Sequence, residues 1–214
     1  HGWGDITEGF TMQYTWYVPH DVQGYINLAG KKLFQKRLDE LFTVELPEDI
    51  PGAHDIQGRI GGYWHGNEPC HHVAYLYNYL GQPWKCQYWV REITSRFYGN
   101  EPGSLSGNDD CGQMSAWYML SAMGFYPVNP VSGQYVFGAP QMEKITLRLV
   151  DGKTFTVKAE GLSKENKYVD YILLNGKRYN KPYINHADIM KGGTLELQMG
   201  NQPSKWGTRP ADRP

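Results

Sequence analysis

The spacing of apolar residues changes near residue 125, and this change constrains the fold more than any other feature of the sequence. Before that point apolar side chains recur at helical spacing. After it they alternate with polar ones, which is typical of strands with one buried face. A chain that switches from a helical period to a period of two is expected to be an α+β protein with its helices and strands in separate regions.

Three apolar seams predict long helices in the first region. Their positions are Leu33, Phe34, Arg37 (through its alkyl stem), Leu38, Leu41 and Phe42; Cys86, Trp89, Val90, Ile93 and Phe97; and Met114, Trp117, Tyr118, Ser121 and Phe125. Pro83 suits the first turn of the second helix. A shorter run over residues 72–80 ends at Gly81, a suitable C-cap. The polar loops between these helices, residues 47–67 and 99–110, are long enough to indicate a functional role.

The second region predicts antiparallel hairpins. Alternating residues over 145–149 lead into Asp151-Gly152, a pair typical of a tight hairpin turn, and a partner strand over 153–159. Asn175-Gly176 predicts a second hairpin between short strands. A last strand is expected over 194–199.

These patterns predict a helical region over residues 1–126, a connector over 127–140, an antiparallel β region over 141–200 and a polar tail over 201–214. The chain begins without Met and without the basic and apolar segments of a signal peptide. Because the first motif starts within eight residues of this end, we expect the chain to be a fragment of a longer protein.

Composition excludes several classes of protein. Aromatic residues make up 14% of the 214 residues, charged residues 20%, and the formal net charge is -1. This balance argues against a disordered tail, a coiled coil and a nucleic-acid-binding module. The sequence contains no run of 18 apolar residues, so it predicts no membrane span. The three cysteines, Cys70, Cys86 and Cys111, form no C-x-x-C pair and are expected to be buried.

The first cluster of chemically capable residues places Glu8 just before a run of aromatic rings. Surrounding rings would raise the pKa of a carboxyl group and suit it to donate a proton. An exposed glutamate in a loop is the simpler alternative. The His20-Asp21 pair that follows is most simply the N-cap of a helix over residues 22–28.

The second cluster combines three histidines with an asparagine and a glutamate. Zinc is disfavoured, because His71 and His72 would point in different directions on a helix and a glycine follows His65. Oxygen ligands from Asn67, Glu68 and backbone carbonyls would suit calcium better. The same run also fits a proline-started helix whose glutamate and histidine act as caps, and both interpretations stay open at this point.

The third cluster, Asn108-Asp109-Asp110, leads directly into the predicted helix at residues 114–125. Carboxylates at a helix N-terminus are stabilised as anions, so ordinary capping explains them. A carboxylate held ionised in this way could also be a general base. Glu8 and Asp110 together would meet the requirement of glycoside hydrolysis for one carboxylic acid and one carboxylate. Two tryptophans outside the helical seams, Trp16 and Trp64, are where we expect a sugar or another domain to be contacted.

At these residues the chain resembles glycoside hydrolase family 92, the calcium-dependent α-mannosidases. The segments that carry the resemblance are Glu8-Gly9, Gln13-Tyr14-Thr15-Trp16, Val18-Pro19-His20-Asp21, His65-Gly66-Asn67-Glu68-Pro69, His71-His72, Pro83-Trp84-Lys85, and residues 107–118 and 124–127. They cover most of residues 1–140 in order, and residues 141–200 fit the β-rich C-terminal portion of the family.

The resemblance implies an exo-acting, inverting enzyme with an N-terminal β-sandwich domain and an (α/α)6 helical barrel. This chain would supply the later barrel helices and the terminal strands, so the missing domain is an expected partner and the isolated chain is expected to be inactive. The implied substrate is a terminal α-linked mannose of a glycan. The implied location is extracytoplasmic, periplasmic or secreted.

The resemblance also implies roles for individual residues. Glu8 corresponds to the general acid and Asp110 to the base, with Asp109 beside it, and the division of roles among residues 108–110 stays open. Asn67 and Glu68 would bind Ca²⁺. The expected substrate-binding residues are Trp16, His20, Asp21, Trp64 and His71, the last of them in the surroundings of the site.

Two other functions stay open at this point. A helical-barrel glycosidase could act on another sugar, and faster cleavage of a glucoside than of a mannoside would indicate it. A non-catalytic carbohydrate-binding fragment would need aromatic rings but no pair of carboxyl groups, and unchanged turnover after Glu8→Gln would favour it.

Overall fold

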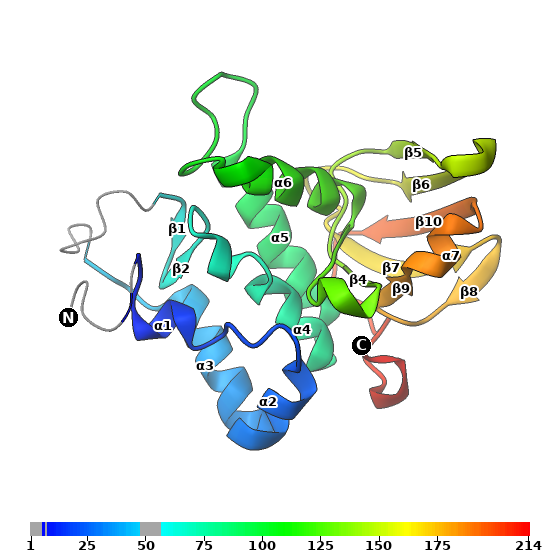
Figure 1. Ribbon diagram of the computed structural model, residues 1–214. Coiled ribbons are helices and arrows are strands. Elements are labelled where there is room, and N and C mark those ends of the chain that lie inside the picture. Colours follow the sequence, from blue (N-terminus) through cyan, green and yellow to red (C-terminus); the bar gives the residue numbers. More distant parts are fainter. Residues whose placement is uncertain (1–5, 7, 48–56) are drawn as a thin grey trace. The chain divides into compact units, whose positions relative to one another are not determined.

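The computed structural model describes residues 6, 8–47 and 57–214 and divides into two compact units. Unit 1 comprises His1–Val73 with Ile93–Tyr118, and unit 2 comprises Ala74–Glu92 with Met119–Pro214. This division follows contacts in space, whereas the regions predicted from the sequence follow the type of secondary structure. Figure 1 shows the elements of both units.

Unit 1 is built mainly from short helices. Its elements are α1 (Thr11–Tyr14), α2 (Val22–Ala29), α3 (Lys31–Thr43), β1 (Arg59–Ile60), β2 (Tyr63–Trp64), η1 (Glu68–Cys70), η3 (Asp110–Gly112), and parts of η2 (Val73–Tyr75), α5 (Pro83–Phe97) and α6 (Gln113–Met123). The helices predicted at residues 33–42 and 86–97 are confirmed. Asp21 caps α2, because its side chain accepts a hydrogen bond of 2.8 Å from the Gly24 amide.

The helical seam of α3 is only partly buried. Phe34, Leu38, Leu41 and Phe42 lie in the core of unit 1, whereas Leu33 is 46% exposed. Aromatic rings contact one another in this core. Trp16 and Phe34, for example, form a T-shaped pair with ring centroids 5.2 Å apart.

Unit 2 contains two sheets and a short helical segment. Its strands are β3 (Phe125–Tyr126), β4 (Gln134–Phe137), β5 (Lys144–Arg148), β6 (Thr154–Glu160), β7 (Tyr168–Leu174), β8 (Lys177–Tyr179), β9 (Tyr183–Asn185) and β10 (Gly193–Gly200). Unit 2 also contains helices α4 (Leu76–Tyr79) and α7 (His186–Met190) and the 3-10 helices η4 (Pro130–Ser132), η5 (Val150–Gly152) and η6 (Pro210–Asp212). The remaining parts of η2, α5 and α6 belong to it as well. The strand orders are β5-β6-β10-β7-β8 and β3-β4-β9.

Both predicted hairpins are present in the larger sheet. β5 pairs antiparallel with β6, and β7 with β8. Each turn has two consecutive residues at positive φ: Asp151 at 69° and Gly152 at 72°, and Asn175 at 51° and Gly176 at 76°. These values suit the hairpin turns that match the twist of the strands.

The expectation of a wholly antiparallel region is wrong for one strand pair. β10 pairs antiparallel with β7 but parallel with β6, from Gly193 opposite Phe155 to Gln198 opposite Glu160. Turn residues specify pairing between neighbouring strands in the sequence, whereas the place of β10 between β6 and β7 depends on contacts between distant segments.

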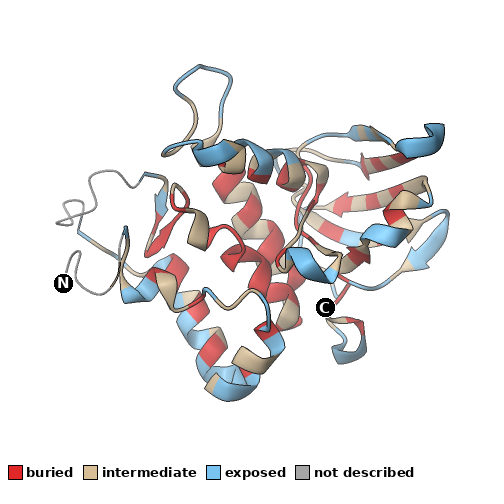
Figure 2. Cartoon of the chain, viewed as in Figure 1, coloured by how far each residue is buried: buried red, intermediate tan, exposed pale blue. Residues whose placement is uncertain are grey.

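One face of this sheet forms the apolar core of unit 2. Alternate residues of β6 and β10 are buried, among them Phe155, Val157, Leu195 and Leu197 (Figure 2). This is the period of two that the sequence displays.

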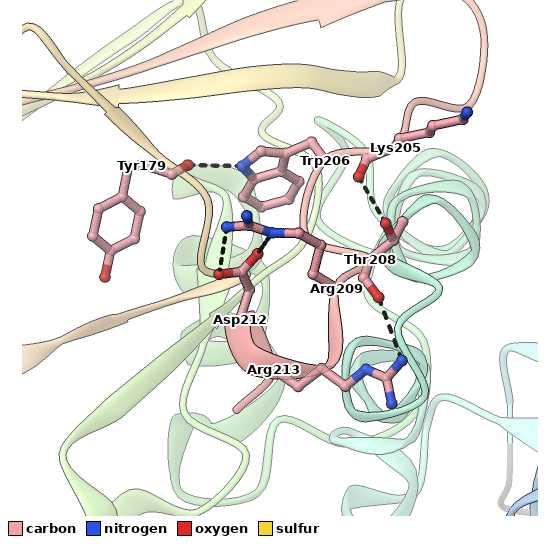
Figure 3. A network of polar contacts seen from close by, with 7 residues as sticks. All are labelled: Tyr179, Lys205, Trp206, Thr208, Arg209, Asp212 and Arg213. Atoms are coloured by element: carbon pink, nitrogen blue, oxygen red, sulfur yellow. Dashed lines mark hydrogen bonds and ion pairs between the residues drawn. The ribbon is translucent and has the colours of Figure 1, made fainter.

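Two segments of unit 2 are more ordered than their sequences predicted. The connector contains β4, which pairs with both β3 and β9. The expected polar tail buries Trp206, whose indole N–H donates to the Tyr179 carbonyl oxygen at 2.8 Å, and it contains an ion pair between Arg209 and Asp212 at 2.6 Å (Figure 3). A single buried tryptophan is a weak pattern in a sequence window rich in polar residues.

None of the helices in the described part of the chain has the length and apolar character that crossing a membrane requires.

Candidate active site

Two glycine-containing loops of unit 1 meet backbone to backbone. Gly107 has a φ of 79°, and a Cβ atom added there would lie 2.9 Å from the Gly66 carbonyl oxygen. A side chain at Gly66 would in turn lie 2.8 Å from the Gln57 carbonyl oxygen. Residues without side chains therefore allow the loop before Asn67 to touch the loop before Asp110.

The segment that carries Glu8 is tied to the same place. The Asn67 side-chain amide donates to the Glu8 carbonyl oxygen. Gln13 in α1 accepts a hydrogen bond from the Phe10 amide at 2.9 Å and donates one to the Gly62 carbonyl oxygen. The bonds of Asn67 and Gln13 connect the start of the described chain to the residues on either side of β2, although the partners are 59 and 49 residues apart.

Glu68 is close enough to two carboxyl groups from other segments, Glu8 and Asp110, for their charges to act on it. The pKa of Glu68 is raised, mainly by burial and then by the negative charges of Asp110 and Glu8. One of its carboxylate oxygens, Oε1, is buried and accepts no hydrogen bond within the described part of the chain. Such an arrangement is costly in a folded protein unless a proton, a cation or a ligand compensates for it.

Tyr14 is a residue of this cluster that the sequence analysis did not assign to the site. Burial raises the pKa of its phenol, a hydrogen bond from the Asn67 side chain lowers it, and the charges of Glu8 and Glu68 raise it further. Its ring lies against Gly9, where an added Cβ atom would be 2.5 Å from the ring. Its position six residues after Glu8, in the same motif, was the available signal.

The adjacent residues Asp109 and Asp110 have different surroundings. Both carboxylate oxygens of Asp109 accept from Ser115, one from the amide at 3.0 Å and the other from the hydroxyl at 2.6 Å. These bonds hold the pKa of Asp109 below its usual range. Asp109 therefore acts as a cap at the start of α6, whereas Asp110 is exposed at the start of η3.

Several predicted site residues have other positions than expected. The Glu8 side chain is exposed, so the expected enclosure by rings is absent among the described residues. Trp16 and Trp64 are 3% and 0% exposed, so neither presents a ring face to solvent in this chain. Large apolar rings next to polar loops fit a core as well as a sugar site, and the sequence could not separate the two.

His20 is exposed, and Asp21 serves as the cap of α2 described above. His71 is 1% exposed, and both of its ring nitrogens are hydrogen-bonded within unit 1. Of the cysteines expected to be buried, Cys111 is exposed and has a φ of 53°. It lies in the turn between Asp110 and α6, which places it at the surface.

Metal-binding capacity in this cluster rests on oxygen atoms. No group of three or more His, Cys, Asp or Glu side chains converges as a metal site in residues 6, 8–47 and 57–214. Asn67 and Glu68 contribute one amide and one carboxylate. A cation that also accepts carbonyl oxygens and water as ligands fits such a set better than zinc does.

Comparison with known proteins agrees with this chemistry. The model of the glycosyl hydrolase family 92 catalytic domain matches residues 1–201. A family GH92 alpha-mannosidase from Bacteroides thetaiotaomicron, solved in complex with mannoimidazole, is 64% identical with a TM-score of 0.96, covering 100% of this chain and 28% of that one. A GH92 inverting mannosidase from the same species is 38% identical with a TM-score of 0.86, covering 99% and 30%.

A protein from Arthroderma benhamiae described as an uncharacterized secreted glycosidase is 34% identical over 203 residues, which are 92% of this chain and 24% of that protein. The chain thus spans between 24% and 30% of the length of these relatives. The family model matches residues 1–201 of this chain. The matched part includes the segments that carry Glu8, Glu68 and Asp110. The chain belongs to glycoside hydrolase family 92.

Proposed function

We propose that the chain contributes the acid and base groups of an exo-acting α-mannosidase that removes terminal α-linked mannose with inversion. The observation that carries the proposal is the electrostatic effect of Glu8 and Asp110, which come from separate segments of unit 1, on the half-buried Glu68. Relatives described as α-mannosidases and as an inverting mannosidase support the choice of sugar and stereochemistry.

In the proposed reaction Glu8 donates a proton to the glycosidic oxygen as the bond from that oxygen to the anomeric carbon breaks. Asp110 accepts a proton from the water that attacks the anomeric carbon from the opposite face. Inverting enzymes need about 6.5–9.5 Å between the two carboxyl groups to leave room for this water. We assign Asp109 a positioning role, because both of its carboxylate oxygens are bonded to Ser115.

We propose calcium as the cofactor. The fit rests on Glu68, whose buried Oε1 lacks a donor within the described residues, and on the adjacent buried Asn67. Oxygen-rich, partly amide-based sites are typical of Ca²⁺. When bound, the ion would supply positive charge for sugar hydroxyls. Asn67 would then have two tasks, because its amide nitrogen also holds the Glu8 backbone.

For the whole protein we propose an (α/α)6 barrel completed by helices outside this chain, an N-terminal β-sandwich domain as partner, and an extracytoplasmic location. The lengths of the relatives and the secreted glycosidase among them support these proposals. The chain by itself is then expected to have little or no activity.

The test is an assay of the whole protein on aryl α-glycosides. The proposal expects the α-mannoside to be cleaved faster than the α-glucoside, and expects EDTA to abolish activity until calcium is restored. Faster glucoside cleavage would refute the sugar, and full activity in EDTA would refute the cofactor.

A further inference from the structure

Two histidines and two tyrosines of unit 1 form a hydrogen-bonded network next to the loop that carries Asn67 and Glu68. His65 is 0% exposed, and its ring nitrogens contact the Tyr63 hydroxyl at 2.8 Å and the Tyr98 hydroxyl at 2.6 Å. The Nε2 atom of His71 lies 2.9 Å from the His65 carbonyl oxygen, and its Nδ1 atom lies 3.1 Å from the Gln113 amide nitrogen.

The partners determine where the ring protons are. A carbonyl oxygen can only accept, so His71 carries its proton on Nε2, and its Nδ1 accepts from the Gln113 amide. The Tyr98 hydroxyl donates to the Met114 carbonyl oxygen at 3.1 Å, so it accepts from Nε2 of His65. Nδ1 of His65 then accepts from the Tyr63 hydroxyl.

Both rings are therefore neutral, and burial supports this assignment. The pKa of His65 is well below its ordinary value, and that of His71 is lowered to about 4, in both cases mainly because the charged form would be desolvated. A charged imidazole would have two donors, and Nδ1 of His71 would then oppose the donor amide of Gln113.

The network connects the two loops that carry the candidate functional residues. His65 and His71 lie on either side of Asn67 and Glu68 in the sequence. Gln113, which is bonded to His71, and Met114, which accepts from Tyr98, lie in the first turn of α6, three and four residues after Asp110. The indole N–H of Trp117 adds a third bond between the same segments, donating to the His71 carbonyl oxygen at 2.9 Å.

We infer that His71 and Gln113 are a pair of positioning residues that fix Asp110 relative to Asn67 and Glu68. The Gly66–Gly107 contact brings the loops together, but it is a contact of backbones without directional bonds. The hydrogen bond from Gln113 to His71 fixes the orientation of the first residue of α6 relative to the loop that carries Asn67 and Glu68. In this role His71 acts on the reaction through Gln113, because both of its ring nitrogens are already bonded within the chain.

The inference rests on the proposed α-mannosidase activity, so its test combines kinetics with a measurement that needs no turnover. Two variants of the whole protein remove the bond from either side. Gln113→Met removes the donor at nearly constant length. His71→Gln keeps a donor for the His65 carbonyl oxygen but loses the acceptor Nδ1. Gln141→Met is the matched control, because Gln141 is also half-buried but lies in unit 2.

Each variant is expected to lower kcat per folded molecule about tenfold, the usual scale for residues that orient a ligand or catalytic group from behind, with little change in KM. The double variant should lose no more than either single one, because both remove the same bond. Unchanged kcat, a change confined to KM, or losses that multiply in the double variant would each overturn the inference. If a His71 variant does not fold, Tyr98→Phe tests the parallel link through His65 with the same expectations.

Hydrogen exchange separates this inference from the proposed function. Ser115 lies two residues after Gln113, and its amide donates to Asp109. The amide hydrogen of Ser115 should therefore exchange faster in Gln113→Met than in the parent protein or in Gln141→Met. Equal exchange would overturn the inference whatever the enzyme's activity. A parent protein without mannosidase activity would refute the proposed function alone.

Discussion

The two compact units of this chain differ in which polar side chains they bury. Unit 1 buries three histidines, His65, His71 and His72, together with Gln13 and Asn67. Unit 2 buries Asn78, Gln87, Ser121 and Asp212, and its one histidine, His186, is exposed. The core of unit 2 is formed by apolar side chains on alternate positions of its strands.

This difference shows which interactions specify each unit. Apolar burial is non-directional and tolerates substitutions that keep volume and pattern. Buried polar groups require partners at defined distances and angles, because an unpaired one costs free energy. The buried histidines of unit 1 can therefore hold neighbouring loops in place, whereas the strands of unit 2 are held mainly by their apolar face.

The largest expected effect separates catalysis from stability within unit 1. Asp110→Asn should lower kcat on an aryl α-mannoside by about 10³-fold, within the range for loss of a general base. The melting temperature should hardly change, because the Asp110 side chain is exposed. Steady-state kinetics and thermal melts of the same preparations measure both.

Asp109→Asn is the matched control for Asp110→Asn. It removes charge from a carboxylate that is bonded to Ser115, so we expect a loss of kcat below about tenfold, the lower end of the range for supporting residues. A larger loss of kcat in Asp109→Asn than in Asp110→Asn would indicate that Asp109 is the general base and Asp110 the positioning residue.

The opposite result is expected in unit 2. Leu197 is fully buried in β10, so Leu197→Ala should lower the free energy of unfolding by about 2–5 kcal/mol, with kcat per folded molecule unchanged. Urea unfolding and active-site-normalised kinetics test this. Glu196→Ala, on the other face of the same strand, should change stability by less than about 0.5 kcal/mol. Equal losses in the two variants would contradict the assignment of faces.

Acid should destabilise unit 1 selectively. Burial lowers the pKa of His71 to about 4 and also lowers that of His72. In the unfolded chain these histidines bind protons below about pH 6.5, whereas in the folded chain they stay neutral. Folding stability is thus full above that pH and falls as the pH drops toward 4, by up to about 1.4 kcal/mol per pH unit for each histidine.

Hydrogen exchange at pH 7 and pH 5, corrected for intrinsic rates, would resolve this effect by unit. The single histidine of unit 2, His186, is exposed, so protection there should change less than in unit 1. Equal loss of protection in both units, or greater protection at pH 5, would disagree with the assignment of neutral buried histidines.

The smallest effect concerns the thiols. Cys70 in unit 1 and Cys86 in unit 2 are buried, and burial raises the pKa of both, that of Cys70 to about 12. Cys111 is exposed in the loop beside Asp110. A disulfide reagent should modify one thiol per native chain and all three after denaturation. Mass spectrometry that finds Cys70 or Cys86 modified in the native protein would show that burial in that unit is incomplete.

The same contrast explains how much could be predicted from the sequence. Helix α3 and the hairpins β5–β6 and β7–β8 were predicted because period and turn residues are local signals. The parallel pairing of β10 with β6 depends on distant segments and was missed. So was the burial of Trp206, a single residue without a period.

For the site, sequence motifs identified the segments but not the surroundings of each side chain. His71 was predicted to bind substrate, yet it lies buried between His65 and Gln113. Tyr14 was missed although it lies in the same motif as Glu8. Neither set of surroundings could be predicted, because the direction of a side chain in an irregular loop depends on partners that come from other segments.

The stereochemistry of hydrolysis tests the central claim most directly. The whole protein would be mixed with an aryl α-mannoside in deuterated buffer, and the anomeric proton of the first mannose released would be followed by NMR before mutarotation. Transfer to water with Glu8 as acid and Asp110 as base predicts that β-mannose appears first. Initial release of α-mannose would show a retaining reaction and contradict the roles assigned to Glu8 and Asp110.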